Sequence, residues 1–296
     1  MKSKAILKFG VPKGSLEEAT NELFARAGWK ISKHERSYFP SINDPEIDLA
    51  LARTQEMAGY IFAGVFDAGI AAIDWMQEEG LEDQLIHVTN LVYSKASLRP
   101  TRWVLCVAGD SPYQKAEDLA GKRVATEVQN LAQRYFAAKG VEDVDIFYSW
   151  GATEAKIAQG MADAIIEVTE TGSTIRAQGL RIIDEVLVSN PVLVANAEAW
   201  EDPVKRAKIE QLRILLEGAL RARTLVALKM NVPTARLRDI EAMLPALHSP
   251  TICRLEDQDW VSVETVVETR RVRDLIPALK AAGAEGIFEY SLNKVI

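Results

Sequence analysis

The sequence predicts an α/β protein that ends in a small second domain. Along most of the chain, short apolar runs alternate with amphipathic stretches, which is the pattern of strands and the helices that cover them. After residue 220 the order changes to strand, helix, strand, strand, helix, strand. That order is typical of the ferredoxin-like split unit, so we place a domain boundary near residue 220.

Local residue types support each element. The apolar run Ala5–Phe9 predicts the first strand, and a helix should follow because Ser15 and Glu18 have the spacing of a capping box. Gly28 can end that helix. Further strands are predicted at Asp48–Ala52, Trp103–Ala108, Arg123–Thr126, Asp145–Tyr148, Ala164–Val168 and Leu187–Ala195.

Apolar residues at helical spacing, including Ile209, Leu212 and Leu216, predict a connecting helix over residues 208–220. Beyond it, we expect strands and helices in the split-unit order. The strands are Thr224–Met230, Thr251–Leu255, Trp260–Val267 and Gly286–Tyr290, and the helices are Pro233–Leu244 and Val272–Ala282.

Composition narrows the class of function. The 296 residues are 48% hydrophobic and 26% charged, which is ordinary for a soluble protein with a sizeable core. The net charge of −7 and the lack of a basic cluster argue against a nucleic-acid partner. The sequence has no apolar run of signal-peptide length at its start. No apolar run elsewhere reaches the roughly 20 residues that are needed to span a bilayer. We therefore expect a cytoplasmic protein without a membrane partner.

Histidine and cysteine give little sign of a metal or redox centre. His34, His87 and His248 are scattered and form no ligand pair, so we expect no metal ion held by the protein alone. Cys106 and Cys253 lack CxxC spacing and lie in apolar, strand-like runs. We expect both to be reduced core residues.

The stretch Glu167–Gly179 has the shape of an anion-binding turn, because a strand, a short polar loop and a helix-like segment follow one another. In a purely structural interpretation, Thr171 or Ser173 caps a helix and Gly172 supplies the turn. In a functional one, backbone N–H groups and hydroxyls hold a phosphate while a carboxylate accepts hydrogen bonds from sugar hydroxyls. A 5-phosphoribosyl group meets both needs. The residues concerned are Glu167, Glu170, Thr171, Gly172, Ser173 and Thr174.

Three other places could carry chemistry. Lys13 and Gly14 follow the first strand, and a lysine at a helix N-terminus opposes the helix dipole. Arg53 ends a strand and Asp74 follows the apolar run AGIAAI, although a surface ion pair or a helix cap would also explain them.

The third place is SWGATEAK, in which glycine lets the backbone approach a ligand closely. Its candidate residues are Gly151, Ala152, Thr153 and Glu154. The structural alternative is helix capping by Ser149 or Thr153, with Glu154 complementing the dipole.

These motifs together resemble a known family. ADAIIEVTETGSTIRAQGLR resembles the phosphoribosyl-diphosphate (PRPP) loop of phosphoribosyltransferases, and in particular that of the long-form ATP phosphoribosyltransferases, the first enzymes of histidine biosynthesis. FGVPKGSLEEA, DLALARTQEMAGYIFAGVFDAGIAAID, KRVATEVQNLAQRYFAAKG and SWGATEAKIAQGMADAI are similar to other blocks of that family in the same order. LVALKMNVP opens a stretch that resembles its regulatory domain, so the resemblance covers nearly the whole chain.

The resemblance implies a two-lobed catalytic part like the type II periplasmic binding proteins, followed by an ACT-like regulatory domain. Lobe I would combine residues 1–97 with 187–207, and lobe II, with the PRPP loop, would be residues 98–186. Residues 208–220 would connect them to the regulatory domain, residues 221–296.

The implied reaction transfers the 5-phosphoribosyl group from PRPP to N1 of ATP. Its products are 1-(5-phospho-β-D-ribosyl)-ATP and pyrophosphate, and Mg²⁺ enters on the pyrophosphate of PRPP. Lys13 and Glu167 would be catalytic, and the loop Glu167–Thr174 would bind PRPP. ATP would contact Lys13, Gly14, Arg53, Asp74 and the turn Gly151–Glu154. The family often has arginine where this chain has Ser15, and many members have aspartate where it has Glu167.

The resemblance also implies regulation and assembly. L-histidine would inhibit from an interface between chains, contacting Ser249, Thr251, Ala282 and Ala284, and AMP is a further candidate inhibitor. The chains would form dimers that assemble into hexamers. Three alternatives stay open at this point: a merely structural or dimerising C-terminal domain, a non-catalytic small-molecule sensor with an ACT-like domain, and another phosphoribosyltransferase of the salvage type.

Overall fold

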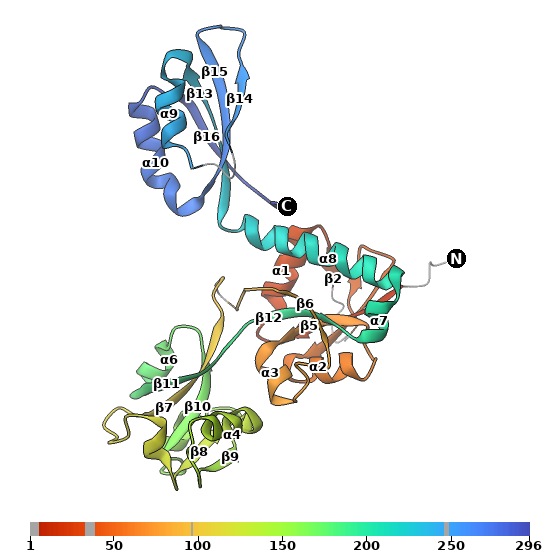
Figure 1. Cartoon of the computed structure of the whole chain (residues 1–296), viewed down its shortest axis with the longest axis vertical. Helices are drawn as coiled ribbons and strands as arrows, with labels where there is room; N and C mark the ends of the chain where they lie inside the picture. The colour runs from red at the N-terminus through yellow and green to blue at the C-terminus, as the bar shows by residue number, and fades with distance from the viewer. Residues whose placement is uncertain (1–5, 33–38, 96, 246–248) are drawn as a thin grey trace. The chain divides into compact units, whose positions relative to one another are not determined.

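The computed structural model describes residues 6–32, 39–95, 97–245 and 249–296, and it divides the chain into two compact units (Figure 1). The first unit comprises Met1–Ala25 with Trp29–Arg213, and the second comprises Arg26–Gly28 with Ile214–Ile296. Within the described residues, the first unit holds two five-stranded sheets and a short two-stranded ribbon, and the second holds one four-stranded sheet. His34 and His248 lie outside the described residues.

The first sheet has the strand order β4-β1-β5-β12-β6. Strand β1 is parallel to β4 and β5, whereas β12 is antiparallel to β5 and β6. The strands of this sheet are β1 (Leu7–Lys13), β4 (Ile47–Arg53), β5 (Ala68–Ala72), β6 (Ile86–Asn90) and β12 (Pro191–Ala195). The helices between them in sequence are α1 (Glu17–Ala27), α2 (Thr54–Phe62) and α3 (Ile73–Glu78). The ribbon consists of β2 (Ile31–Ser32) and β3 (Ser41–Ile42).

Close packing of α2 on β1 depends on a glycine. A Cβ atom at Gly10 would lie 2.4 Å from Met57 Sδ and 2.7 Å from Phe66 Cδ2, distances at which these side chains would have to move. Met57 is fully buried and Phe66 is nearly so. The missing side chain therefore lets the helix lie against the strand that carries Lys13.

The second sheet has the order β11-β7-β10-β8-β9. In it β8, β9 and β10 are parallel to one another, and β7 is antiparallel to β10 and β11. The strands are β7 (Thr101–Ala108), β8 (Arg123–Thr126), β9 (Asp145–Tyr148), β10 (Ala164–Thr169) and β11 (Leu180–Ser189), and the helical segments are η1 (Ala116–Leu119), α4 (Gln129–Ala138), α5 (Ala155–Ala158) and α6 (Ser173–Ala177). Its core includes Trp103, Leu105, Phe136 and Ile166.

The strand expected over Leu187–Ala195 is two strands that belong to different sheets. β11 pairs with β7 up to Ser189, and β12 then pairs with β5 from Pro191 onward. The chain changes sheets at Asn190, and Pro191 takes the first position of its strand, where a missing N–H is tolerated. The segment that we assigned to lobe I from residue 187 thus begins within the second sheet.

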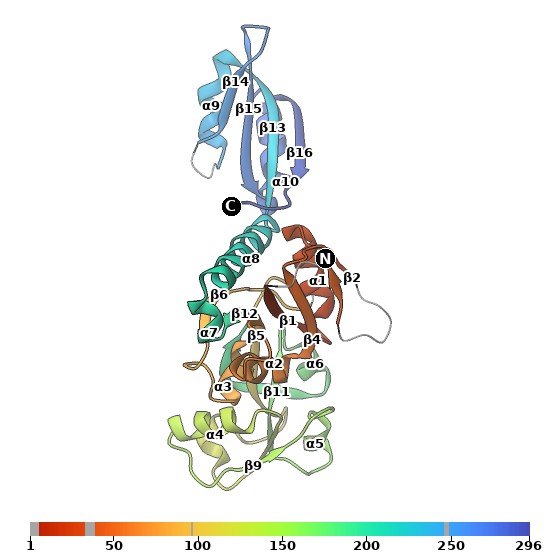
Figure 2. The same ribbon diagram turned by 90° about the vertical axis from the view of Figure 1, so that its right-hand side faces the viewer.

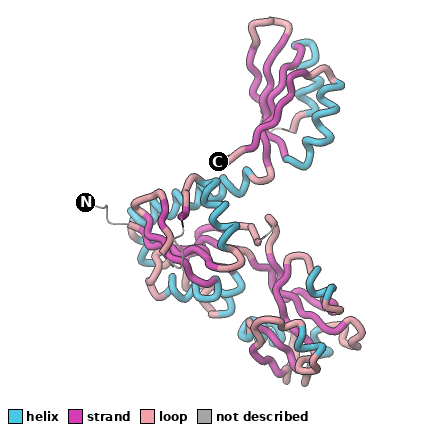
Figure 3. Tube along the Cα trace, turned by 180° about the vertical axis from the view of Figure 1, so that it is seen from behind, coloured by secondary structure: helices cyan, strands magenta, loops and turns pink. Residues whose placement is uncertain are grey.

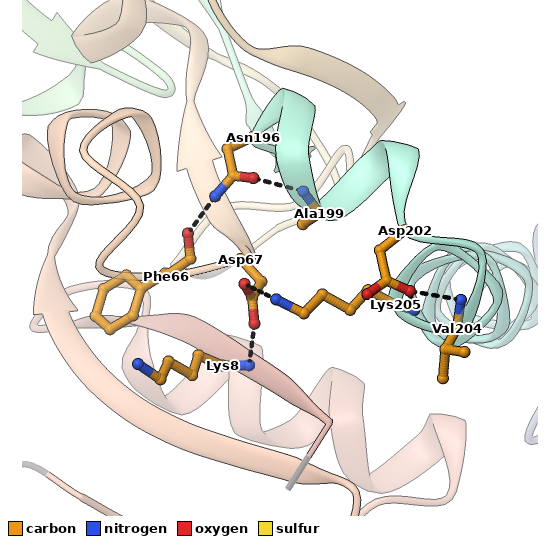
Figure 4. Close-up of polar contacts among 8 residues, drawn as sticks. All are labelled: Lys8, Phe66, Asp67, Asn196, Ala199, Asp202, Val204 and Lys205. Atoms are coloured by element: carbon orange, nitrogen blue, oxygen red, sulfur yellow. Dashed lines mark hydrogen bonds and ion pairs between the residues drawn. The ribbon is translucent and has the colours of Figure 1, made fainter.

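Helix α8 (Pro203–Ala222) is anchored to the first sheet at its start (Figure 4). Asp67 is buried, and its two carboxylate oxygens accept from Lys205 Nζ and from the backbone N–H of Lys8, each at 2.7 Å. Asn196 caps the preceding helix α7 (Ala197–Glu201) by accepting from Ala199 N at 2.8 Å. Asp67 therefore has a structural role, and α8 is longer than the connecting helix that we predicted over residues 208–220.

The C-terminal sheet has the order β14-β15-β13-β16 with every neighbouring pair antiparallel, which confirms the ferredoxin-like unit. Its strands are β13 (Leu225–Pro233), β14 (Thr251–Arg254), β15 (Trp260–Glu268) and β16 (Glu285–Ser291); η2 (Thr234–Arg236), α9 (Leu237–Met243) and α10 (Thr269–Ala281) complete it. Both α9 and α10 lie on one face of the sheet, where their apolar residues form a core with β13 and β15 (Figures 2 and 3).

Two local expectations were wrong. Cys106 is buried as expected, but Cys253 is exposed because β14 is an edge strand whose residues all face solvent. The predicted capping box of Ser15 and Glu18 is not at the helix start: β1 extends to Lys13, α1 begins at Glu17, and it is Glu17 Oε2 that accepts from Gly14 N, at 3.4 Å. Of the helices in the described ranges, none has both the length and the apolar character that crossing a bilayer requires.

Candidate active site

Two cations lie side by side where parallel strands of the first sheet end. Lys13 is the last residue of β1, Arg53 is the last residue of β4, and the two are partners in the strand register. Gly14 follows with a φ of 103°, a conformation that glycine adopts without steric cost, and turns the chain toward α1. Ligands of open α/β sheets commonly bind at such carboxyl ends of strands.

A cleft of about 590 Å³ opens at this edge, entirely within the first unit. It is lined by residues from both five-stranded sheets and from the segments that join them. Aromatic rings contribute flat apolar walls, and charged groups lie around them. The lining includes Lys13, Gly14, Ser15, Arg53, Asp74, Trp75, Tyr93, Lys95, Trp103, Glu127, Thr169, Glu170 and Ser189.

Asp74 lines this cleft, but its carboxylate hydrogen-bonds to a group in the protein interior. The residue is only 5% exposed at the start of α3, and its Oδ2 accepts from Trp103 Nε1 at 2.7 Å. Its backbone N–H donates to Ser189 Oγ at 3.1 Å. Burial raises the pKa of the Asp74 carboxyl, although these hydrogen bonds oppose the rise. The nucleotide contact expected of Asp74 stays a prediction.

Loops from the second sheet supply hydroxyls and carboxylates. Because β8, β9 and β10 are parallel, the segments after them meet at one edge of that sheet. Glu127 follows β8, the turn Ser149–Glu154 follows β9, and the predicted PRPP loop follows β10. Glu127 lines the cleft, and burial together with the charge of Asp74 raises the pKa of its carboxyl.

Glu167 lies among these carboxylates. Its Oε1 accepts from the backbone N–H of Val168 at 3.2 Å, and the Thr153 hydroxyl also hydrogen-bonds to it. Burial, and then the nearby charges of Glu154 and Glu127, raise the pKa of Glu167 to about 7. Near neutral pH the Glu167 carboxyl, beside the predicted phosphoribosyl loop, is therefore protonated in some molecules and ionised in others.

The loop after β10 has the predicted shape of strand, polar turn and short helix. Gly172 precedes α6 with a φ of 72°, in the left-handed region, and is itself the cap residue rather than Thr171 or Ser173. Thr169 Oγ1 accepts from Gly172 N at 2.8 Å. Thr171 Oγ1 accepts from Ser173 N at 3.4 Å and lies 3.0 Å from Ser173 Oγ, so the two hydroxyls are neighbours.

The turn after β9 also has an unusual backbone conformation. Gly151 and Ala152 have φ values of 74° and 51°, both in the left-handed region that a non-glycine residue rarely occupies. Ser149 and Thr153 are buried, and their hydroxyls lie 3.3 Å apart in a hydrogen bond that closes the turn. Strain of this kind commonly occurs at ligand sites.

The predicted residues differ in whether they line the cleft. Lys13, Gly14, Arg53, Asp74 and Glu170 do. The other predicted residues of the first unit are not among its lining residues: Glu167, which lies in β10 and hydrogen-bonds with Thr153, and the turns Gly151–Glu154 and Thr171–Thr174.

Among the residues of the cleft wall that sequence reasoning missed are Trp75, Lys95, Trp103 and Glu127. A signal existed for Glu127, because it directly follows an apolar predicted strand in the same way that the loop carboxylates do.

The residues expected to bind histidine lie at opposite edges of the C-terminal sheet. Thr251 is on the edge strand β14, with Ser249 just before it, and both are exposed. The turn that contains Ala282 and Ala284 leads into the other edge strand, β16. Three inter-strand steps separate the edges, roughly 14 Å. Within one chain these residues do not converge.

Comparisons with known proteins identify the family. A model of ATP phosphoribosyltransferase matches residues 53–218, and a model of the HisG C-terminal domain matches residues 222–294. The ATP phosphoribosyltransferase of Nitratidesulfovibrio vulgaris strain DP4 is 60% identical over 296 residues, which is 100% of both chains. This chain belongs to the ATP phosphoribosyltransferase family. A relative of the same name from Solidesulfovibrio magneticus is 56% identical over 291 residues, 98% of each chain.

A solved structure supports the same family assignment. The fold matches an ATP phosphoribosyl transferase (HisG:HisZ) complex from Thermotoga maritima with a TM-score of 0.59 and 27% identity, over 71% of this chain and 98% of that one. The predicted family and enzyme class are thus confirmed, and so is the α/β fold of the catalytic part, followed by the C-terminal domain of the family. The protein is a pentosyltransferase of the first step of histidine biosynthesis, and the sensor and salvage-enzyme alternatives fall away.

The raised pKa of Glu167 has a consequence for stability. A carboxyl whose pKa rises on folding stabilises the fold below its unfolded pKa, and that contribution is lost as the pH rises through about 7. The substitution Glu167→Gln removes the ionisable carboxyl and with it this loss of stability at higher pH. The free energy of unfolding of the variant, relative to the parent, should therefore rise between about pH 5 and pH 8, by at most about 3 kcal/mol. Urea unfolding at a series of pH values measures it.

Asp184→Asn gives a control of opposite sign. Asp184 accepts from Lys139 Nζ at 2.7 Å and Tyr135 Oη at 2.6 Å, and these partners lower the pKa of its carboxyl. Its stabilising contribution is present above the unfolded pKa of an Asp carboxyl, about 4, and is lost as the pH falls through the lower folded pKa. In a series extended into the acid range, this variant should therefore lose stability relative to the parent as the pH rises toward about 4, and the difference should stay constant above that. A pH-independent difference for Glu167→Gln would show that its carboxyl is not perturbed.

Proposed function

We propose that the cleft and the loops beside it bind ATP and PRPP and transfer the 5-phosphoribosyl group to N1 of ATP, releasing pyrophosphate. One observation carries the proposal. Cations at the strand ends of the first sheet line the same cleft as a carboxylate and hydroxyl groups at the strand ends of the second. Two polyanionic substrates with sugar hydroxyls need both kinds of group.

PRPP would bind to the loop after β10. The N–H groups and hydroxyls of Thr171, Gly172, Ser173 and Thr174 would hold the 5′-phosphate, which suits the left-handed glycine and the paired hydroxyls of this turn. Glu167 or Glu170 would accept from the ribose hydroxyls. Ser97 Oγ donates to Glu170 Oε2 at 3.1 Å and would hold that carboxylate in place.

ATP would bind toward the first sheet. Lys13 and Arg53 would contact its phosphates, because adjacent strand ends bring their charges to one place. Trp75 packs edge to face against the buried Trp103, with ring centroids 6.4 Å apart, and would offer its partly exposed ring to the adenine. The turn Gly151–Glu154 and Asp74 would complete the nucleotide site.

The chemistry asks for charge stabilisation rather than a nucleophile. As pyrophosphate leaves, the anomeric carbon gains positive character, which Glu167 and its neighbours would stabilise, while Lys13 would stabilise the departing anion. The remaining contribution is positioning of two bound reactants.

Mg²⁺ would come with the substrate. Among the residues that the structure describes, no three His, Cys, Asp or Glu side chains gather as a metal site. Mg²⁺ commonly binds phosphates with one or two carboxylates, so Glu127 and Glu170 in the cleft wall fit an ion held on the pyrophosphate of PRPP. When bound there, the ion would neutralise charge on the departing pyrophosphate.

We also propose that L-histidine inhibits the enzyme from the C-terminal unit. Ser249 and Thr251 of one chain, with the turn around Ala282 and Ala284 of another, would form the site, because one chain alone keeps them at opposite sheet edges. The site thus requires a homo-oligomer, a dimer that assembles to a hexamer. AMP is a candidate second inhibitor, and a biosynthetic enzyme of this family would act in the cytoplasm.

The loop assignment predicts a selective loss of turnover. Thr171→Ala and Glu167→Gln should each lower PRPP-dependent activity roughly 10- to 150-fold, since losing one hydrogen bond to a charged group costs about 1.5–3 kcal/mol. Pyrophosphate release and product absorbance with ATP, PRPP and Mg²⁺ measure it. Thr234→Ala is the matched control, because its hydroxyl bonds Gln258 O in the second unit. Parental kinetics in both loop variants would refute the assignment.

The regulatory proposal predicts histidine binding by the intact protein. Calorimetry should detect binding below millimolar histidine, and a coupling of about 1–3 kcal/mol should give 5- to 150-fold inhibition. Thr251→Val should weaken the binding without lowering turnover in the absence of histidine. If the parent binds no histidine at millimolar concentration, the C-terminal unit has only a structural role.

A further inference from the structure

The short helix α3 connects the two five-stranded sheets at both of its ends. At its start, Asp74 accepts from Trp103 on β7, as described above. At its end, Glu78 reaches α4, the helix that follows β8 in the second sheet. Its neighbour Gln77 also accepts, through its backbone oxygen, from the Arg134 guanidinium of α4.

Glu78 supplies the N-terminal cap that α4 lacks. The cap residue Val128 has no side-chain oxygen, and the first turn of α4 carries no acidic residue. Glu78 Oε1 accepts from Asn130 N at 3.0 Å, and Oε2 accepts from Leu131 N at 2.8 Å. The Asn130 side chain donates in return to the backbone oxygen of Glu78 at 3.0 Å. A carboxylate here satisfies free N–H groups and complements the helix dipole.

The capped turn adjoins the cleft. Glu127, which lines the cleft, lies directly before Val128, and Thr126 Oγ1 accepts from Val128 N at 3.2 Å. On the other side, Asp74 and Trp75 in the first turn of α3 line the cleft. One six-residue helix therefore joins the wall that carries the cations to the wall that carries Glu127.

We propose that Glu78 is a positioning residue for phosphoribosyl transfer: by capping α4 from the other sheet, it fixes the second-sheet wall of the cleft relative to Lys13 and Arg53. It touches neither substrate. This inference rests on the proposed placement of ATP and PRPP on opposite walls. Each substrate then keeps the contacts of its own wall when the cap is lost, and only their mutual alignment changes.

The expected signature is a fall in kcat with little change in KM. Glu78→Gln keeps the size of the side chain, but its NH₂ group opposes one of the two N–H groups of α4. We expect kcat to fall roughly 10- to 100-fold, because small misplacements of reactants cost that much. KM for ATP and PRPP should stay within about threefold of the parent. Glu78→Asp keeps the charge on a shorter side chain and should restore part of the rate.

Glu79→Gln is the matched control, because Glu79 accepts from the backbone N–H of Gly59 within the first-sheet part and does not reach α4. Its kcat should be that of the parent. Calorimetric titration with PRPP and Mg²⁺ separates positioning from loss of folded protein, since positioning lowers kcat at full binding stoichiometry. If kcat is unchanged in both Glu78 variants, or falls only in proportion to stoichiometry, the inference is overturned. A parent without activity would instead refute the proposed function.

Discussion

The site depends on a buried hydrogen bond between the two sheets of the catalytic part. The Asp74 carboxylate, almost removed from solvent, accepts from the Trp103 indole of the other sheet. Breaking this bond would leave a buried carboxyl without its partner, which is costly in a protein interior. Because Asp74 lies in the first turn of α3 and Glu78 ends the helix, the two walls of the cleft are joined by one short helix. A cleft with cations on one wall and loops on the other exists only while those walls stay together.

The distribution of charge in the cleft follows from strand direction. Parallel strands end at the same edge, so β1 and β4 bring two cations together, and β8, β9 and β10 bring carboxylates and hydroxyls together. Placing carboxylates here has a cost, because burial first, and neighbouring carboxylate charges second, raise the pKa values of Glu127 and Glu167. The substrate offers a reason to keep them: the reaction builds positive charge on the ribose, and sugar hydroxyls need acceptors.

Apolar runs were enough to predict β8 and β9 with their observed bounds, and the split unit in its full order. They failed for β5, because AGIAA is short, small and buried throughout, and so shows no alternation. The loop after β10 was predictable from its glycine and hydroxyls. The role of Glu78 was not, since its partners Asn130 and Leu131 are far away in sequence. The interior bonds of Asp74 likewise depend on a strand that pairs in the other sheet.

Hydrogen exchange of the backbone amides, with and without PRPP and Mg²⁺, tests the central claim most directly. If PRPP binds at the strand ends of the second sheet, protection should appear in the loop that leads into α6 and in the turn after β9, because bound ligand slows their opening. Adding ATP should then protect the segment after β1 and the start of α2. Amides of β13–β16 should be unaffected by either substrate. Protection confined to the C-terminal unit, or its absence from the loop between β10 and α6, would contradict the account.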